Sequence, residues 1–255
     1  MESKINRYSK QLILINSFFI LAWLIISVFP FIWTFWGSFK VKADFFSRAD
    51  WMFAVTGVNT LIETGDTSTV KAYVESWTEG EFWKATMNTI IITVSVVTIS
   101  LFLGTLGAYA LSRSTYKYTF WILIAALIFR AMPHITLVSG YLFPFFQLNV
   151  WGILPTTIIV LVAINQPFTL WLLYSFFKTV PKELDESALI DGCSYFQAFR
   201  FVIMPVMWPG VVTAGLFSMM LAYNDFTVTS LLLNQQNYTM AVSYTHLTLP
   251  TSNDV

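Results

Sequence analysis

The chain has 255 residues, of which 56% are hydrophobic and only 11% charged, and its formal net charge is zero. Soluble domains usually carry about 25% charged residues, so the composition argues against an ordinary soluble protein. The balanced charge gives no basic field for nucleic acid. One cysteine excludes an intramolecular disulfide and a Cys-cluster metal site, and two histidines are too few for a His-rich centre, so we expect no metal and no cofactor.

Long uncharged runs decide the class of protein. Residues 11–39, 85–112, 131–177 and 201–224 contain no Asp, Glu, Lys or Arg. About 20 apolar residues span the hydrocarbon core as a helix, and the longest run is divided by a turn at 147–155. We therefore predict an all-α polytopic bundle of five membrane helices, at about 12–38, 86–111, 119–146, 153–177 and 202–232. Buried helices of a soluble protein imitate one such run, but hardly five.

Basic residues predict the orientation of the chain. Lys and Arg gather in 1–11, 113–117 and 178–200, which lie on one side if the helices alternate. Short loops rich in Lys and Arg tend to stay in the cytoplasm, so we expect a cytoplasmic N-terminus. Segment 40–85 holds five basic and seven acidic residues and is expected outside. It is interpreted as an ordered connecting loop, with a small cap of one or two short helices as the alternative.

A compact acidic helix is predicted at 181–191. Pro181 suits a first helical turn, and the acidic residues that follow it favour the positive end of the helix dipole. Gly192 suits the left-handed stop just past the helix end, and 194–201 is expected to start a second helix that leads into the membrane. A helix of about ten residues is unstable alone in water and needs a partner surface. From these residues alone, a plain linker helix between two spans remains an alternative.

The stretch "ESALIDGCSYFQAFRFVIMP" at 186–205 resembles the cytoplasmic signature loop of permease subunits of binding-protein-dependent ABC importers. That signature has Glu-Ala-Ala, a Gly four residues after the second Ala, and an Ile-x-Leu-Pro ending. The residues that match it are Glu186, Ala188, Asp191, Gly192 and Pro205. The mild departures from it are Ser187, Val202 and Met204.

Other stretches extend the resemblance over most of the chain. "PFIWTFWGSFK" at 30–40 is similar to the end of the first span of carbohydrate-type permeases, and "MNTIIITVSVVTISLFLGTLGAYALSR" at 87–113 to their second span. "FFKTVPKELDESALIDG" at 176–192 and "YNDF" at 223–226 are also similar to theirs. By pattern, the relatives are maltose- and glycerol-phosphate-type permeases of the subunit with six spans.

The resemblance implies that the acidic helix is a coupling helix that docks on a separate ATPase. The residues implied in coupling are Glu183, Glu186, Ser187, Ala188, Asp191 and Gly192. The implied partners are a dimer of ATP-binding subunits, a second permease subunit and an extracytoplasmic substrate-binding protein, together with the lipid of the cytoplasmic membrane. The chain contains no G-x-x-x-x-G-K-[ST] motif, so ATP hydrolysis is expected on another subunit and no catalytic residue is expected here.

The resemblance also implies alternating access and a carbohydrate or related solute, with a non-sugar solute such as a phosphorylated polyol as the alternative. An intramembrane enzyme or an ATP-independent channel is a more distant reading. An enzyme would need paired catalytic groups inside the spans, where only Arg130, His134 and Asp225 are available.

Polar residues inside the predicted spans suggest a translocation path. A charge at the bilayer centre costs roughly 2.5–3.5 kcal/mol on insertion scales, and such residues usually face a bundle or a water cavity. We expect Arg130, Asn224 and Asp225 to line the path. The alternatives are a structural pair, or end residues that reach the membrane interface.

The final residues differ from what precedes them. We assign 1–242 to the permease domain, and we expect 243–255, "SYTHLTLPTSNDV", to be non-native because it resembles translated adapter sequence. The expectation is that the gene continues after about Val242 with a sixth span of the length that a membrane helix requires. A genuine five-span subunit with an external tail is the alternative.

Overall fold

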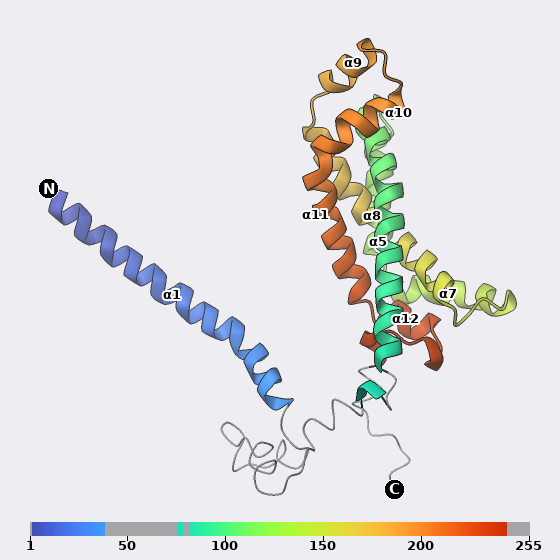
Figure 1. Ribbon diagram of the computed structural model, residues 1–255, viewed down its shortest axis with the longest axis horizontal. Coiled ribbons are helices and arrows are strands. Elements are labelled where there is room, and N and C mark those ends of the chain that lie inside the picture. The colour runs from blue at the N-terminus through green and yellow to red at the C-terminus, as the bar shows by residue number, and fades with distance from the viewer. Residues whose placement is uncertain (1, 39–75, 79–81, 244–255) are drawn as a thin grey trace, which may run out of the picture. The chain divides into compact units, whose positions relative to one another are not determined.

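The computed structural model describes residues 2–38, 76–78 and 82–243, and the regular elements in this part of the chain are helices (Figure 1). Two compact units, 1–79 and 80–255, are described each by itself. Most of segment 40–85 and of the tail 243–255 lies outside the described residues, and so do the expectations made for them.

The first unit contains one long helix, α1 (Glu2–Gly37). Residues 12–35 of α1 form an apolar stretch of 24 residues, and none of its most apolar window is buried. A helix that is apolar all round and uncovered suits a lipid or protein environment rather than water. The predicted first span is confirmed.

Three long helices form the centre of the second unit: α5 (Phe82–Arg113), α8 (Leu154–Thr179) and α11 (Met204–Tyr223). Each packs against the other two, and Figure 1 shows them side by side. Within the described residues, four helices are long and apolar enough to cross a membrane. They are Leu12–Phe35, α5, α8 and the helical stretch that runs from Tyr195 to the end of α11. The predicted second and fourth spans are confirmed within a few residues.

Two glycines allow these helices to approach closely. A Cβ atom added at Gly104 of α5 would lie 3.0 Å from Cγ2 of Thr169 on α8. One added at Gly210 of α11 would lie 2.8 Å from Cγ of Phe176, which real Cβ atoms essentially never do. Small residues at such crossings are typical of membrane helix packing.

The predicted third span is broken rather than continuous. It consists of α6 (Thr119–Ala131) and α7 (His134–Gln147), which meet at an angle of 86°. Pro133 has no N–H to continue the hydrogen bonds of the helix. Met132 before it has an extended backbone, with φ −68° and ψ 142°. Five spans, as predicted, are present only if this bent pair counts as one.

The predicted fifth span also ends early. α11 stops at Tyr223, and a separate short helix, α12 (Thr227–Leu232), follows a break at 224–226. The Asp225 carboxylate accepts hydrogen bonds from the N–H groups of Val228 at 2.8 Å and Thr229 at 3.2 Å. This bonding starts a new helix at the residue where an unbroken α11 would have continued, so the prediction of one helix over 202–232 was wrong.

The turn predicted at 147–155 is present and joins the bundle to the C-terminal elements. Asn149 and Gly152 have positive φ values of 53° and 82°. The Gly152 N–H donates to the carbonyl of Leu232 at 3.0 Å, and Asn237, in the 3₁₀ helix η2 (Gln235–Asn237), donates from Nδ2 to the carbonyl of Gly152 at 2.7 Å. These bonds fix α12 and η2 against the end of the bundle.

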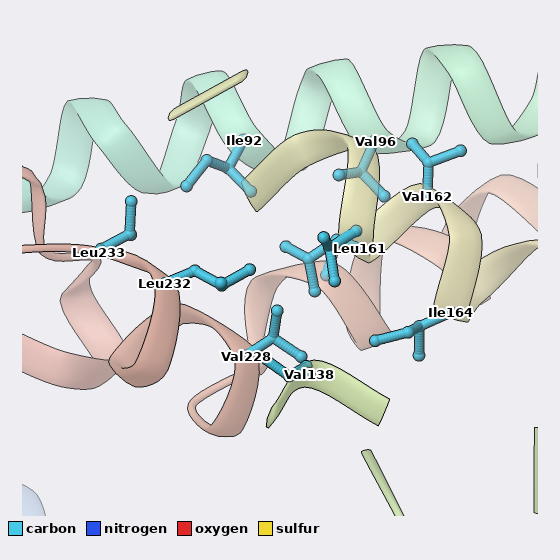
Figure 2. Packing of buried hydrophobic residues seen from close by; sticks show 11 residues of the cluster. Ile92, Val96, Val138, Leu161, Val162, Ile164, Val228, Leu232 and Leu233 are labelled. Atoms are coloured by element: carbon cyan, nitrogen blue, oxygen red, sulfur yellow. The ribbon is translucent and has the colours of Figure 1, made fainter. Parts of the chain in front are cut away.

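Two buried apolar clusters fill the second unit. Figure 2 shows the first, where Ile92 and Val96 of α5 face Leu161 of α8 and Leu232 after the break. The second surrounds Leu173 and Phe177 of α8 and lies toward the end where α9 is found.

Candidate functional site

The acidic helix exists as α9 (Glu183–Ile190) and projects from one end of the bundle (Figure 1). It begins two residues later than predicted, because Pro181 lies outside it and the carbonyl of Lys182 accepts the first helical bonds, from Asp185 and Glu186. Gly192 ends it with a φ of +86°, as predicted. The N–H groups of Gly192 and Cys193 bond to the carbonyls of Leu189 and Ala188, which is a Schellman ending.

Most residues predicted for coupling lie on one exposed surface. Glu183, Glu186, Asp191 and Gly192 are exposed, and Ser187 is exposed with its hydroxyl bonded to the Glu183 carbonyl. Ala188 is the exception. It is 4% exposed and therefore does not belong to this exposed surface.

Sequence reasoning missed an apolar part of the same loop. Ile190 is 86% exposed, Tyr195 73% and Phe196 63%. The loop therefore exposes apolar as well as acidic side chains. The sequence does show apolar residues on either side of Gly192, but only the structure of the loop shows that their side chains are exposed.

The loop is tied to α11 without a gap. Ser194 caps α10 (Tyr195–Ala198) through a capping box with Gln197, with Oγ accepting from the Gln197 N–H at 3.3 Å. The π-helical turn η1 (Phe199–Ile203) then continues directly into α11. The loop from Ser194 onward is therefore connected to α11 by continuous helical backbone.

Asp185, which sequence reasoning placed only among the dipole-favoured acids, faces inward. Its Oδ1 accepts from the Tyr109 hydroxyl at 2.5 Å, and its Oδ2 lies 2.8 Å from Nη2 of Arg113. The side chains of Asp185 and Arg113 are 12% and 16% exposed. Because Tyr109 and Arg113 lie more than 70 residues before Asp185, only the folded chain shows that they meet.

The predicted path residues come together around a second feature, a cavity of about 330 Å³. Arg130, Asn224 and Asp225 all line it, with His134 and Asn165. Arg130 contacts Nε2 of His134, and Asp225 is turned toward the start of α12. The cavity therefore lies where both breaks occur, between α6 and α7 and between α11 and α12.

Asn165 and Ser218 are polar residues of this region that sequence reasoning did not name. Nδ2 of Asn165 on α8 donates to Oγ of Ser218 on α11 at 2.5 Å, and both side chains are buried. The Asn165 Oδ1 is buried and has no hydrogen-bond partner among the described residues. Each is a polar residue inside an otherwise apolar helix, which is the signal that was overlooked; that they pair is shown only by the fold.

Neither feature has the make-up of a metal centre. Within the described residues, no group of three His, Cys, Asp or Glu side chains lies close enough to hold a metal ion. The chemistry that this arrangement offers is recognition: an exposed acidic and apolar loop at one end, and a mixed polar cavity along the bundle.

Comparison with known families decides the class. Residues 100–250 match the model of the family described as binding-protein-dependent transport system inner membrane component. The chain belongs to this family. The family description places its members in the inner membrane, and the apolar helices of this member agree with a multi-pass protein.

Curated relatives of this family member include sugar permeases. It is 32% identical over 220 residues to the trehalose/maltose transport system permease protein of Thermococcus litoralis, covering 85% of this chain and 73% of the relative. It is 29% identical over 218 residues to a diacetylchitobiose uptake system permease protein of Streptomyces coelicolor, covering 81% of this chain and 65% of that relative. The chain thus spans about two thirds of the length of these relatives.

A solved structure shows the same fold. It is a chain from the crystal structure of a bacterial ABC transporter involved in the import of the acidic polysaccharide alginate. The TM-score is 0.71 at 21% sequence identity, and the match covers 91% of this chain and 77% of that chain. The predicted fold class, an all-α polytopic helix bundle, is confirmed.

Proposed function

We propose that the chain is the membrane-spanning permease subunit of an ATP-driven importer that moves a carbohydrate by alternating access. The observation that carries this proposal is α9, an exposed acidic helix that follows α8 and is joined to α11 through α10 and η1. Such a helix transmits a push from a partner to the bundle when the partner contacts it differently in two states.

The partner of α9 is a separate ATPase dimer, and it docks on the 181–200 loop. Glu183, Glu186 and Asp191 favour a cleft with basic groups, and Ile190 with Tyr195 gives the apolar centre that stable interfaces have. On this proposal the loop and the N-terminus lie in the cytoplasm, the side that the distribution of Lys and Arg also favours. A second permease subunit completes the pathway, and an extracytoplasmic binding protein delivers the solute.

The solute passes through the cavity at the two helix breaks, with Arg130, Asn224 and Asp225 as its polar lining. A carbohydrate suits a cavity that combines apolar walls with a few polar groups. The relatives named for trehalose/maltose and diacetylchitobiose uptake support this class of solute over a non-sugar one.

Reconstitution tests the proposal. The chain is purified together with its ATPase, second permease and binding-protein partners, and uptake of maltose, trehalose and diacetylchitobiose into proteoliposomes is measured with and without ATP. Parent complex is expected to take up one of these saccharides only with ATP and binding protein. Glu186→Lys reverses a charge on the exposed face of α9 and is expected to release the ATPase or to stop uptake. ATP-dependent uptake at the parent rate in this variant would contradict docking through α9.

A further inference from the structure

The side chains of Tyr109, Arg113 and Asp185 connect the projecting helix to two membrane helices at once. Both Asp185 oxygens are engaged, Oδ1 by the Tyr109 hydroxyl and Oδ2 by the Arg113 guanidinium. A carboxylate held at both oxygens cannot rotate freely, so the direction of α9 relative to the end of α5 is fixed.

Arg113 extends the connection to the end of α8. Its Nη1 donates to the carbonyls of Phe177 at 3.3 Å and Val180 at 3.1 Å. The last carbonyls of a helix have no partner within the helix, and basic side chains often satisfy them. One guanidinium therefore holds the ends of α5, α8 and α9 together.

Aromatic packing gives this set a rigid base. The Tyr109 ring lies 5.7 Å from the Phe177 ring and 4.9 Å from the Phe199 ring, measured between centroids. Phe199 belongs to η1, so the same tyrosine also touches the connection to α11. The hydroxyl of Tyr109 is consequently placed by three elements before it meets Asp185.

We propose that Tyr109, Arg113 and Asp185 form the joint through which movement of α9 passes to α5 and α8. This rests on the proposed coupling role of α9. The three are positioning residues, because they face the bundle rather than the exposed surface on which a partner docks.

An ionic joint suits positioning better than it suits stability. Well-packed apolar residues often replace a buried ion pair without loss of stability, so such a pair is weak support for a purely stabilising role. Direction comes from the hydrogen bond that the Tyr109 hydroxyl donates to Asp185 Oδ1, because charge-assisted hydrogen bonds have narrow geometry. α9 has eight residues and is too short to hold a direction by itself.

Distance measurement between spin labels tests the joint in the full chain. One label is placed on Cys193, the chain's only cysteine, next to the end of α9, and the other on a cysteine introduced by Lys117→Cys, in the exposed loop after α5. The parent should give one narrow distance peak. Asp185→Asn and Tyr109→Phe should lose it, whereas Asp185→Glu should keep a narrow peak.

Tyr116→Phe is the matched control, because Tyr116 is 78% exposed and its loss should leave the peak unchanged. A role in general stability alone would lower the melting temperature and leave a narrow peak below that temperature. An unchanged narrow peak in Tyr109→Phe, which removes a single hydroxyl, would overturn the proposal, even if Asp185→Asn failed to fold.

The assembled transporter separates this proposal from the proposed function. Asp185→Asn should leave the ATPase bound but lower the saccharide transported per ATP by about tenfold, the factor expected when one charge-assisted hydrogen bond is lost. Normal transport per ATP would overturn the joint. If the parent complex neither binds an ATPase nor transports, the proposed function fails, and the label distances still decide whether the joint fixes α9.

Discussion

Gly192 determines how α9 ends, and a graded series of substitutions there tests the structure of the coupling loop. Its φ of +86° is a conformation that L-residues with a side chain rarely adopt. A Cβ atom added at this position would have no heavy atom within 4 Å. The effect of Gly192→Ala therefore comes from backbone strain alone and not from a clash.

The expected loss of stability at the end of α9 follows from the backbone conformation of residue 192. Left-handed backbone costs an L-residue roughly 1–2 kcal/mol, so Gly192→Ala should weaken the helix ending by about that amount. Gly192→Asn should weaken it less, because Asn tolerates this region. Gly192→Pro should weaken it most, since proline fixes φ near −65° and also removes the N–H that donates to Leu189.

Hydrogen exchange of the loop measures this directly. The amide of Cys193 donates to the Ala188 carbonyl at 3.0 Å and should exchange roughly 5–30 times faster in Gly192→Ala, the factor that corresponds to 1–2 kcal/mol. Gly140→Ala is the control, because a Cβ there also meets nothing within 4 Å and φ is not positive.

Equal exchange in Gly192→Ala and the parent would refute the reasoning. An order of increasing effect other than Asn, Ala and Pro would refute it too, because the series rests on φ and, for proline, also on the lost N–H.

Two further predictions concern the bundle. Gly210→Val should lower the melting temperature of the purified chain by overpacking against Phe176, at a cost of about 1–3 kcal/mol, and an unchanged melting temperature would show that α8 and α11 are not this close. Asn224→Leu and Asp225→Leu should reduce saccharide uptake more than they reduce assembly, because polar lining of the cavity is lost. Asp225→Leu also removes the cap of α12, a loss that costs about 0.5–2 kcal/mol, whereas Asp225→Asn keeps a side-chain oxygen that can cap the helix and so separates the two effects. Cysteines at 224 and 225 that never react with aqueous thiol reagents in any nucleotide state would show that these residues do not line a water-filled path.

The sequence was sufficient for what depends on local composition. Uncharged runs located the spans, because a helix in hydrocarbon needs only length and apolarity. Gly192 ended α9 as predicted, because its conformational freedom is a property of the residue itself. The exposed acids of the loop also follow from local pattern.

The breaks could not be located in this way. Proline is tolerated inside membrane helices, and Pro167 lies within an unbroken α8, whereas Pro133 separates α6 from α7 at 86°. Which proline bends sharply depends on what neighbouring helices provide for the freed backbone groups. The break at Asp225 likewise depends on α12 finding a packed position against α7 and α8.

Contacts between residues distant in sequence could not be predicted from the sequence either. In the sequence, Asp185 cannot be distinguished from the exposed acidic residues of the same helix. Only the structure shows that it contacts Tyr109 and Arg113. Asn165 and Ser218 are separated by 53 residues, and no local pattern pairs them.

The central claim is that α9 and its loop dock on an ATPase, and cross-linking from Cys193 tests it most directly. The thiol lies directly after Gly192, and because it is the chain's only cysteine a bifunctional thiol reagent starts from one known place. In the purified complex the account predicts one product that joins this chain to the ATPase subunit and disappears in Cys193→Ser. A co-purifying ATPase that gives no such product, while Cys193 joins only another membrane subunit, would contradict it.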